Sequence, residues 1–187
     1  HMRTFASDFP PNNKHYGTDK KRPDCGFYDA GGRQVSVDHF RLIASRKTSR
    51  ELPLSGGWHD AADYDRRPYH YDVVGDLLGA YLFRPENFSD GQLNIPESSN
   101  GVADIVDEAA WGMLLWLKAQ NADGSVPGWI EATSHPKDYN PSTDSQPYYL
   151  SAATMESTMQ YAAYASMLAL AYRNEGEGAQ ARKFTDS

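Results

Sequence analysis

The chain has 187 residues, of which 40% are hydrophobic and 23% charged, and its formal net charge is −7 at pH 7. These values are typical of a globular domain, and the acidic balance argues against a nucleic-acid partner, which a basic surface would attract. No apolar run approaches the roughly 18 residues of a membrane-spanning helix, so we expect no membrane partner either.

The N-terminal segment, residues 3–57, is polar and rich in turn-forming residues, which predicts an irregular segment that wraps a core. One short strand is expected at 33–37, where valines alternate with polar residues. The single cysteine, Cys25, excludes an internal disulfide. Residues 1–2, His-Met, resemble the remnant of an expression vector, so a signal peptide could have been removed and the compartment stays open.

Two long helices are predicted from apolar residues that recur every three or four positions. The first spans 69–84 and is followed by a loop over 86–100. The second spans 101–120, with Asn100 as its N-cap. Its stretch 109–117 is apolar nearly all round, which predicts a helix that is covered on both sides.

A third helix is predicted at 151–173, after an unusually long loop at 121–150. We expect the helix to turn one apolar stripe toward the core, namely Met155, Met159, Ala162, Ala163, Ser166 and Leu170. A polar, helix-compatible stretch follows Gly176. Three helices with these faces do not close a core, so we expect the chain to be one piece of a larger helical assembly.

The segment 55–64 reads Ser-Gly-Gly-Trp-His-Asp-Ala-Ala-Asp-Tyr. Its carboxylates, Asp60 and Asp63, are three positions apart, so within a helical turn they lie on one side and address one small volume. Like charges at that distance favour a water, a hydrogen-bond donor or a cation between them. The glycine pair Gly56 and Gly57 lets the backbone approach closely. From the spacing alone, a capped loop with two solvated aspartates remains an open alternative.

The same segment closely resembles the Gly-Gly-Trp-Tyr/His-Asp-Ala-Gly-Asp-Tyr signature of glycoside hydrolase family 9, the inverting cellulases and their exo-acting relatives. Two further motifs match in order, at 94–112 and 118–126, and a weaker one lies at 151–154. The resemblance implies an all-α fold, the N-terminal portion of an (α/α)6 barrel with an irregular N-terminal segment. Residues 3–187 would form the N-terminal part of that single domain, with its C-terminal part absent.

The resemblance also implies the reaction, hydrolysis of β-1,4-glucosidic bonds in cellulose or cello-oligosaccharides with inversion of configuration. Inversion uses a base and an acid roughly 6.5–9.5 Å apart, which leaves room for the attacking water. Asp63 matches the family's general base, and Asp60 matches the carboxylate that helps to hold the water. Trp58, His59 and Tyr64 flank the two aspartates as expected substrate-binding residues.

The family's general acid is a glutamate in the C-terminal half of the barrel, and no motif of this sequence matches it. Glu108, inside the second motif, corresponds to a helix-packing position. The chain is therefore expected to carry the base side of the site, to need the missing half of the barrel as its partner, and to be inactive alone. In the long loop, Trp129 and His135 are expected either to form a sugar subsite or to pack the loop onto the barrel.

Two positions depart from the family pattern, Ala62 in place of glycine and Ala110 in place of arginine. The cluster 66–71 adds bulky aromatic side chains, which hints at exo action on short oligosaccharides. An exo-acting hydrolase of glucosamine or chito-oligosaccharides and a non-catalytic carbohydrate-binding half barrel are the alternatives. The resemblance favours a secreted or periplasmic location, whereas an exo-acting enzyme leaves the cytoplasm open.

No cofactor is expected. Some relatives with an immunoglobulin-like domain bind zinc near the start of the barrel, but Cys25, His15 and His39 have an irregular spacing, and a buried thiol is the default for Cys25. Calcium is common in the family, yet no oxygen-rich loop here is distinctive enough to assign. Structural calcium and zinc are therefore left unassigned.

Overall fold

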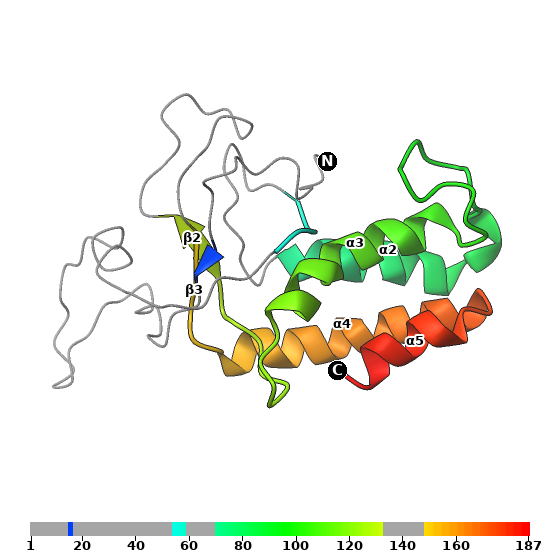
Figure 1. Ribbon diagram of the computed structural model, residues 1–187. Coiled ribbons are helices and arrows are strands. Elements are labelled where there is room, and N and C mark those ends of the chain that lie inside the picture. The colour runs from blue at the N-terminus through cyan, green and yellow to red at the C-terminus, as the bar shows by residue number, and fades with distance from the viewer. Residues whose placement is uncertain (1–14, 17–53, 59–69, 133–147) are drawn as a thin grey trace, which may run out of the picture.

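The computed structural model describes residues 15–16, 54–58, 70–132 and 148–187. Within these ranges, four α-helices lie side by side and a small sheet lies beyond one end of them (Figure 1). The elements in chain order are β1 (His15–Tyr16), α2 (His70–Phe83), the short 3-10 helix η2 (Pro85–Asn87), α3 (Asp104–Ala119), β2 (Ile130–Ala132), β3 (Tyr148–Leu150), α4 (Met155–Asn174) and α5 (Gly178–Thr185).

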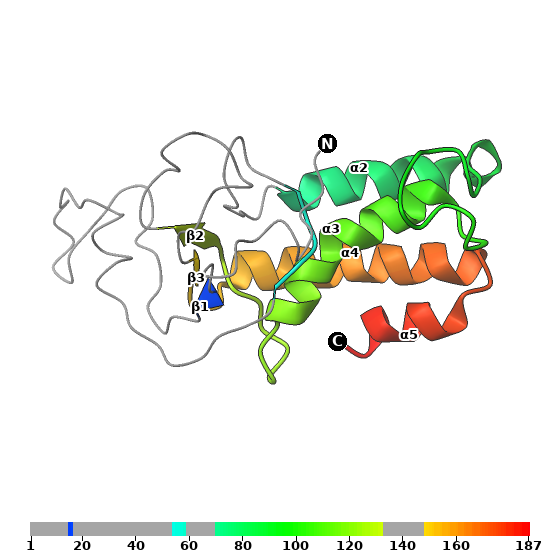
Figure 2. The same cartoon turned by 45° about the horizontal axis from the view of Figure 1, so that its top comes forward.

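The three long helices lie close to where the apolar periodicity predicts them. Helix α2 ends at Phe83, two residues before Pro85, whose ring and missing N–H do not continue a helix. Helix α5 occupies the polar stretch that was expected to be helix-compatible. Helices α2 and α3 contact each other and α4, while α5 packs on α4 (Figure 2).

The predicted starts of α3 and α4 need correction. Helix α3 begins at Asp104 with Ala103 as its N-cap, so the prediction of Asn100 as the cap is wrong. Asn100 instead orders the preceding turn, since its side chain accepts from the Val102 N–H at 2.8 Å. Helix α4 begins four residues later than expected because Thr154 caps it, its side-chain oxygen accepting from the Ser157 N–H at 3.1 Å.

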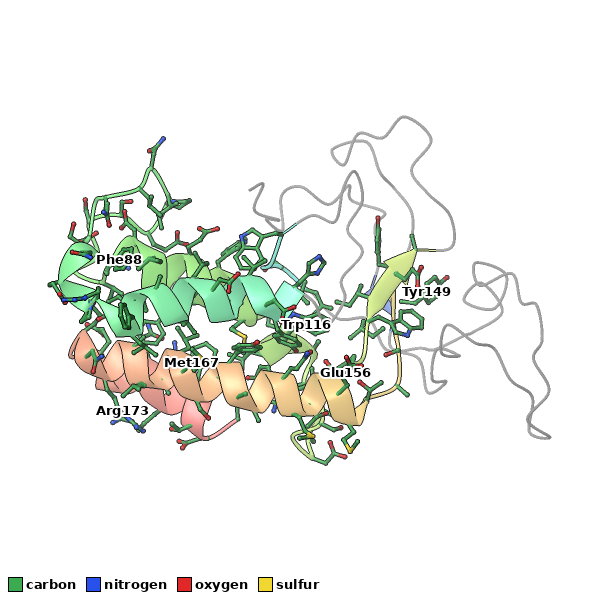
Figure 3. The ribbon with its side chains drawn as sticks, turned by 180° about the vertical axis from the view of Figure 1, so that it is seen from behind. Phe88, Trp116, Tyr149, Glu156, Met167 and Arg173 are labelled. Carbon is green, nitrogen blue, oxygen red and sulfur yellow. The ribbon has the colours of Figure 1, made fainter. Side chains whose placement is uncertain are left out.

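The core of the bundle is an aromatic cluster that joins three helices. The Tyr71 ring of α2 lies 5.2 Å from the Trp116 ring of α3 and 6.0 Å from the Tyr164 ring of α4, measured between centroids. Figure 3 labels Trp116 where the ribbons of α2 and α4 approach each other. Tyr71 and Trp116 are both buried, so each helix contributes a large apolar area to one shared core.

The prediction that α3 is covered on both sides is confirmed. No residue of its stretch 109–117 is exposed, and Met113, Leu115 and Trp116 are buried although they point in different directions around the helix axis. Helices α2 and α4 and the segment 54–58 together provide this cover.

The prediction that the methionine stripe of α4 faces the core is wrong. Met155 is 79% exposed and Met159 64%, and Leu170 lies on the same exposed face. The opposite face, which carries Tyr161 and Leu168, is the buried one. Residues 157–172 contain no charged side chain, so the apolar pattern fits either face, and the buried face is the one that carries the aromatic rings of Tyr161 and Tyr172.

The predicted loop at 121–150 contains two strands, which corrects that assignment. Strand β3 pairs in parallel with β1 and antiparallel with β2, so the order in the sheet is β1-β3-β2. The strand expected at 33–37 lies outside the described residues. None of the described helices is long and apolar enough to cross a membrane.

Candidate functional site

The segment that leads into the candidate site, residues 54–58, lies within the described ranges. Of the predicted site residues, Trp58 and Trp129 lie within the described ranges. Five others lie outside them, namely His59, Asp60, Asp63, Tyr64 and His135. Their roles as base, water-holding carboxylate and substrate contacts stay predictions.

Residues 55–58 of the signature segment lie along helix α3, and Gly57 and Trp111 exchange two hydrogen bonds, one between backbones and one from a side chain to a backbone. The Gly57 N–H donates to the Trp111 carbonyl at 2.8 Å, and the Trp111 indole N–H donates to the Gly57 carbonyl at 2.7 Å. At the start of the segment, the Lys118 ammonium donates to the Ser55 hydroxyl at 2.6 Å. The signature segment and the motif at 94–112, which are far apart in the sequence, are therefore in direct contact in the structure.

The Trp58 side chain makes the third contact between these motifs. Its indole N–H donates to Glu108 Oε1 at 2.7 Å, and both side chains are buried. A buried indole N–H without an acceptor would destabilise the fold, and Glu108 provides the acceptor that this donor needs. The prediction of Glu108 as a packing position is confirmed.

Two glycines allow the segment to approach α3 this closely. Gly56 has φ +116°, and a Cβ built there would lie 2.9 Å from the Leu115 backbone nitrogen. On the helix, a Cβ at Gly112 would lie 2.3 Å from Cη2 of Trp58. Glycine is required at both positions because a methyl group would collide with backbone in one case and with a rigid ring in the other.

Sequence reasoning named Gly56 and Gly57 as residues that allow a close approach, and the structure identifies what they approach. It missed Trp111 and Gly112 as the receiving surface. Both stand in the second matched motif, so the only signal was that this motif accompanies the first one. Neither motif, taken alone, predicts that the two segments are in contact.

Trp129 is the other described candidate. It precedes β2, is 4% exposed, and its backbone carbonyl accepts from the Ser151 N–H at 3.0 Å. The Ser151 hydroxyl accepts in turn from the Gly128 and Trp129 N–H groups, at 2.7 and 3.1 Å. These bonds fix the backbone beside Trp129, and both alternatives for its side chain, a sugar subsite with His135 or packing of the loop onto the barrel, stay predictions.

Carboxyl groups gather in the first turns of α3. Asp104, Asp107 and Glu108 are all buried, and Asp104 accepts from the Gly91 and Leu93 N–H groups, which ties the preceding loop to the helix. Burial raises the pKa of Asp107 to about 6, helped by the nearby charges of Glu97, Asp104 and Asp90 and opposed by the Asn100 hydrogen bond.

No group of three or more His, Cys, Asp or Glu side chains among the described residues is arranged to hold a metal ion. The zinc candidates Cys25 and His39 lie outside those residues, as does the side chain of His15. Structural calcium and zinc therefore stay unassigned.

Comparison with known proteins identifies the family. A sequence model described as "Glycosyl hydrolase family 9" matches residues 9–186. The chain belongs to glycosyl hydrolase family 9. A cellulose 1,4-beta-cellobiosidase of Acetivibrio thermocellus is 30% identical over 126 residues, which are 59% of this chain and 14% of that protein.

Solved structures of family 9 members share the fold. A metagenome-derived family 9 endoglucanase superposes with a TM-score of 0.62 at 32% identity, over 87% of this chain and 33% of its own. A mutant of the thermostable endoglucanase from Alicyclobacillus acidocaldarius gives 0.60 at 26% identity, over 74% of this chain and 28% of its own.

These comparisons confirm the all-α fold class, since the neighbours are (α/α)6 barrel enzymes and this chain corresponds to part of such a barrel. The chain spans about a third of these solved relatives and 14% of the curated cellobiosidase.

Proposed function

We propose that the protein which contains this chain hydrolyses β-1,4-glucosidic bonds in cellulose or cello-oligosaccharides, with inversion of configuration. The match of residues 9–186 to glycosyl hydrolase family 9 carries the proposal, together with the names of relatives that act on cellulose. The chain contributes the base side of the site, and the rest of the barrel contributes the acid.

In this proposal Asp63 is the general base and Asp60 holds the attacking water. The base removes a proton from the water as the water attacks the anomeric carbon, while an acid on the other side of the bond protonates the leaving oxygen. His59 and Tyr64 flank the aspartates and contact the sugar. The docking of Gly57 and Trp58 onto α3 supports this assignment, because it gives the segment that leads into the aspartates a rigid support.

Substitution of the base tests the proposal in the full-length enzyme. Asp63→Asn should lower kcat on cello-oligosaccharides by about 10²–10⁴-fold, because an amide does not accept the proton of the attacking water. Asp60→Asn should slow the reaction strongly but less. Asp76→Asn, a surface change on α2, is the matched control and should leave kcat unchanged. Near-normal activity of Asp63→Asn would remove the base assignment.

The stereochemistry and the substrate are tested on the wild-type enzyme. Proton NMR during the first turnovers should show the α-anomer at the new reducing end, as single displacement at a β-linkage requires. Initial accumulation of the β-anomer would contradict inversion. Faster attack on polymeric cellulose than on cellobiose would reject the exo-acting alternative, and preferential cleavage of chito-oligosaccharides would favour the amino-sugar alternative.

The dependence on the rest of the barrel has its own test. Residues 1–187 alone should release no reducing sugar, because no segment of them matches the family's acid motif. Calorimetric titration of this chain with cellotetraose should likewise give no binding heat. Clear binding would instead support the carbohydrate-binding half barrel.

A further inference from the structure

We infer that Glu108 is a positioning residue for the two aspartates, acting through the indole of Trp58; the inference rests on the proposed function. Glu108 lies on α3, and Trp58 lies in the segment that docks on it, 50 positions away in the sequence. The hydrogen bond between them is 2.7 Å long, and Glu108 is 9% exposed and Trp58 5%.

The bond fixes more than one side chain because it acts with two other contacts. Indole has a single N–H, so the bond to Glu108 sets the direction in which the ring edge points. The absence of a Cβ at Gly112 lets the six-membered part of the ring lie against α3. The paired bonds between Gly57 and Trp111 hold the adjoining backbone. Together these contacts fix the position and orientation of Gly57 and Trp58 on α3.

The aspartates follow this anchor at once. Asp60 comes two positions after Trp58, and Asp63 comes five positions after it. Since consecutive Cα atoms are about 3.8 Å apart, the Cα of Asp60 lies within about 7.6 Å of the Cα of Trp58 in any conformation. A shift of the indole therefore passes to the carboxylates through very little chain.

The carboxyl group of Glu108 suits this task. A hydrogen bond to a charged acceptor is stronger than one between neutral groups, and burial of both partners keeps water from competing for it. A glutamine in its place retains an oxygen that accepts from the indole, whereas an alanine retains none. The pair of variants thus separates the loss of the hydrogen bond from the loss of the charge.

The test compares three variants of the full-length enzyme on cellotetraose, well below their unfolding temperatures. Glu108→Ala should lower kcat by about 10–100-fold with KM changed less than about threefold, because displacement of a catalytic group by about 1 Å costs up to about 100-fold. Glu108→Gln should restore kcat to within about threefold of wild type. Val106→Ala truncates a fully buried residue of the same helix and should destabilise the protein while leaving kcat unchanged.

Each outcome decides the inference. A wild-type kcat in folded Glu108→Ala would overturn it, and so would a loss in Val106→Ala as large as that in Glu108→Ala, since α3 would then act only through stability. A glutamine variant as impaired as the alanine variant would overturn the role of the hydrogen bond. If Glu108→Ala does not fold, Trp111→Phe removes the bond to the Gly57 carbonyl, and an unchanged kcat there would overturn the anchor. Failure of the wild-type enzyme to cleave cellotetraose would instead refute the proposed function.

Discussion

Helices α3 and α4 are both apolar over most of their length, yet they are buried to very different extents. In α3, no residue of 109–117 is exposed, and the helix receives α2, α4 and the signature segment on its sides. In α4, one face packs on α2, α3 and α5, while the other leaves Met155 and Met159 largely exposed. A mainly apolar helix is therefore covered all round in α3 and on one face only in α4.

The difference shows what apolar composition does and does not determine. It indicates how much of a helix surface avoids water, but it does not say which element provides the cover. For α3 the cover comes from other described segments of this chain. The exposed face of α4 also carries Ala162, Ala163 and Ser166, small side chains that let another helix approach closely. A face of this kind is typical of a helix that packs against a further element.

The largest effect is expected from truncation in the covered helix. Trp116→Ala should lower the free energy of unfolding by about 3–5 kcal/mol, because it removes a buried ring that packs on Tyr71. Met159→Ala, on the open face of α4, should change it by less than about 0.5 kcal/mol in residues 1–187 alone. Urea denaturation followed by circular dichroism measures both values.

Repetition of the pair in the full-length enzyme sharpens the comparison. If another element covers α4 there, Met159→Ala should cost about 2–5 kcal/mol, as a buried methionine does, while the cost of Trp116→Ala stays the same. An equally small effect of Met159→Ala in both chains would mean that the face stays open.

A smaller effect is expected from an added methyl group at the contact between the signature segment and α3. Gly112→Ala should destabilise the chain by about 2–3 kcal/mol, because its Cβ would lie 2.3 Å from the Trp58 ring. Gly79→Ala in α2 is the matched control, since a Cβ there meets nothing within 4 Å. That variant should stabilise the helix by up to about 1 kcal/mol. Equal effects of the two variants in thermal unfolding would contradict the close approach of Trp58.

The sequence predicts the helices of this fold well because their signal is local. Apolar residues at three- and four-residue spacing indicate α2, α3 and α4 to within a few residues, and Pro85 marks the end of α2. The strands β2 and β3 escape this reasoning, since each has three residues and their pairing joins Ile130 to Leu150. The apolar pattern does not predict which face of α4 is buried, because neither face carries a charged residue between 157 and 172.

The candidate site divides in the same way. The motif reveals the aspartates and the need for glycine before them, because both depend on adjacent residues. The residues that this segment contacts cannot be predicted from its own sequence, since Trp58 and Glu108 are 50 positions apart and Gly57 and Trp111 are 54 positions apart. Contacts of that span arise from packing of the helices and are visible only in the fold.

The smallest effect concerns the buried carboxyl groups at the start of α3, whereas the acidic residue in the first turn of α4, Glu156, is exposed. Burial raises the pKa of Asp107 from the ordinary 3.8 to about 6, so between these values the folded chain binds a proton more readily than the unfolded chain does. The free energy of unfolding should therefore fall as pH rises from about 4 to about 6. Asp107→Asn should remove that slope and raise stability at pH 7 by about 1–2 kcal/mol. Glu156→Gln, an exposed change in the first turn of α4, should leave the slope in place. Urea titrations at pH 4, 5, 6 and 7 measure this dependence of the free energy of unfolding on pH. A slope that persists unchanged in Asp107→Asn would show that another buried group causes it, and the burial of Asp107 would then not distinguish the start of α3 from that of α4.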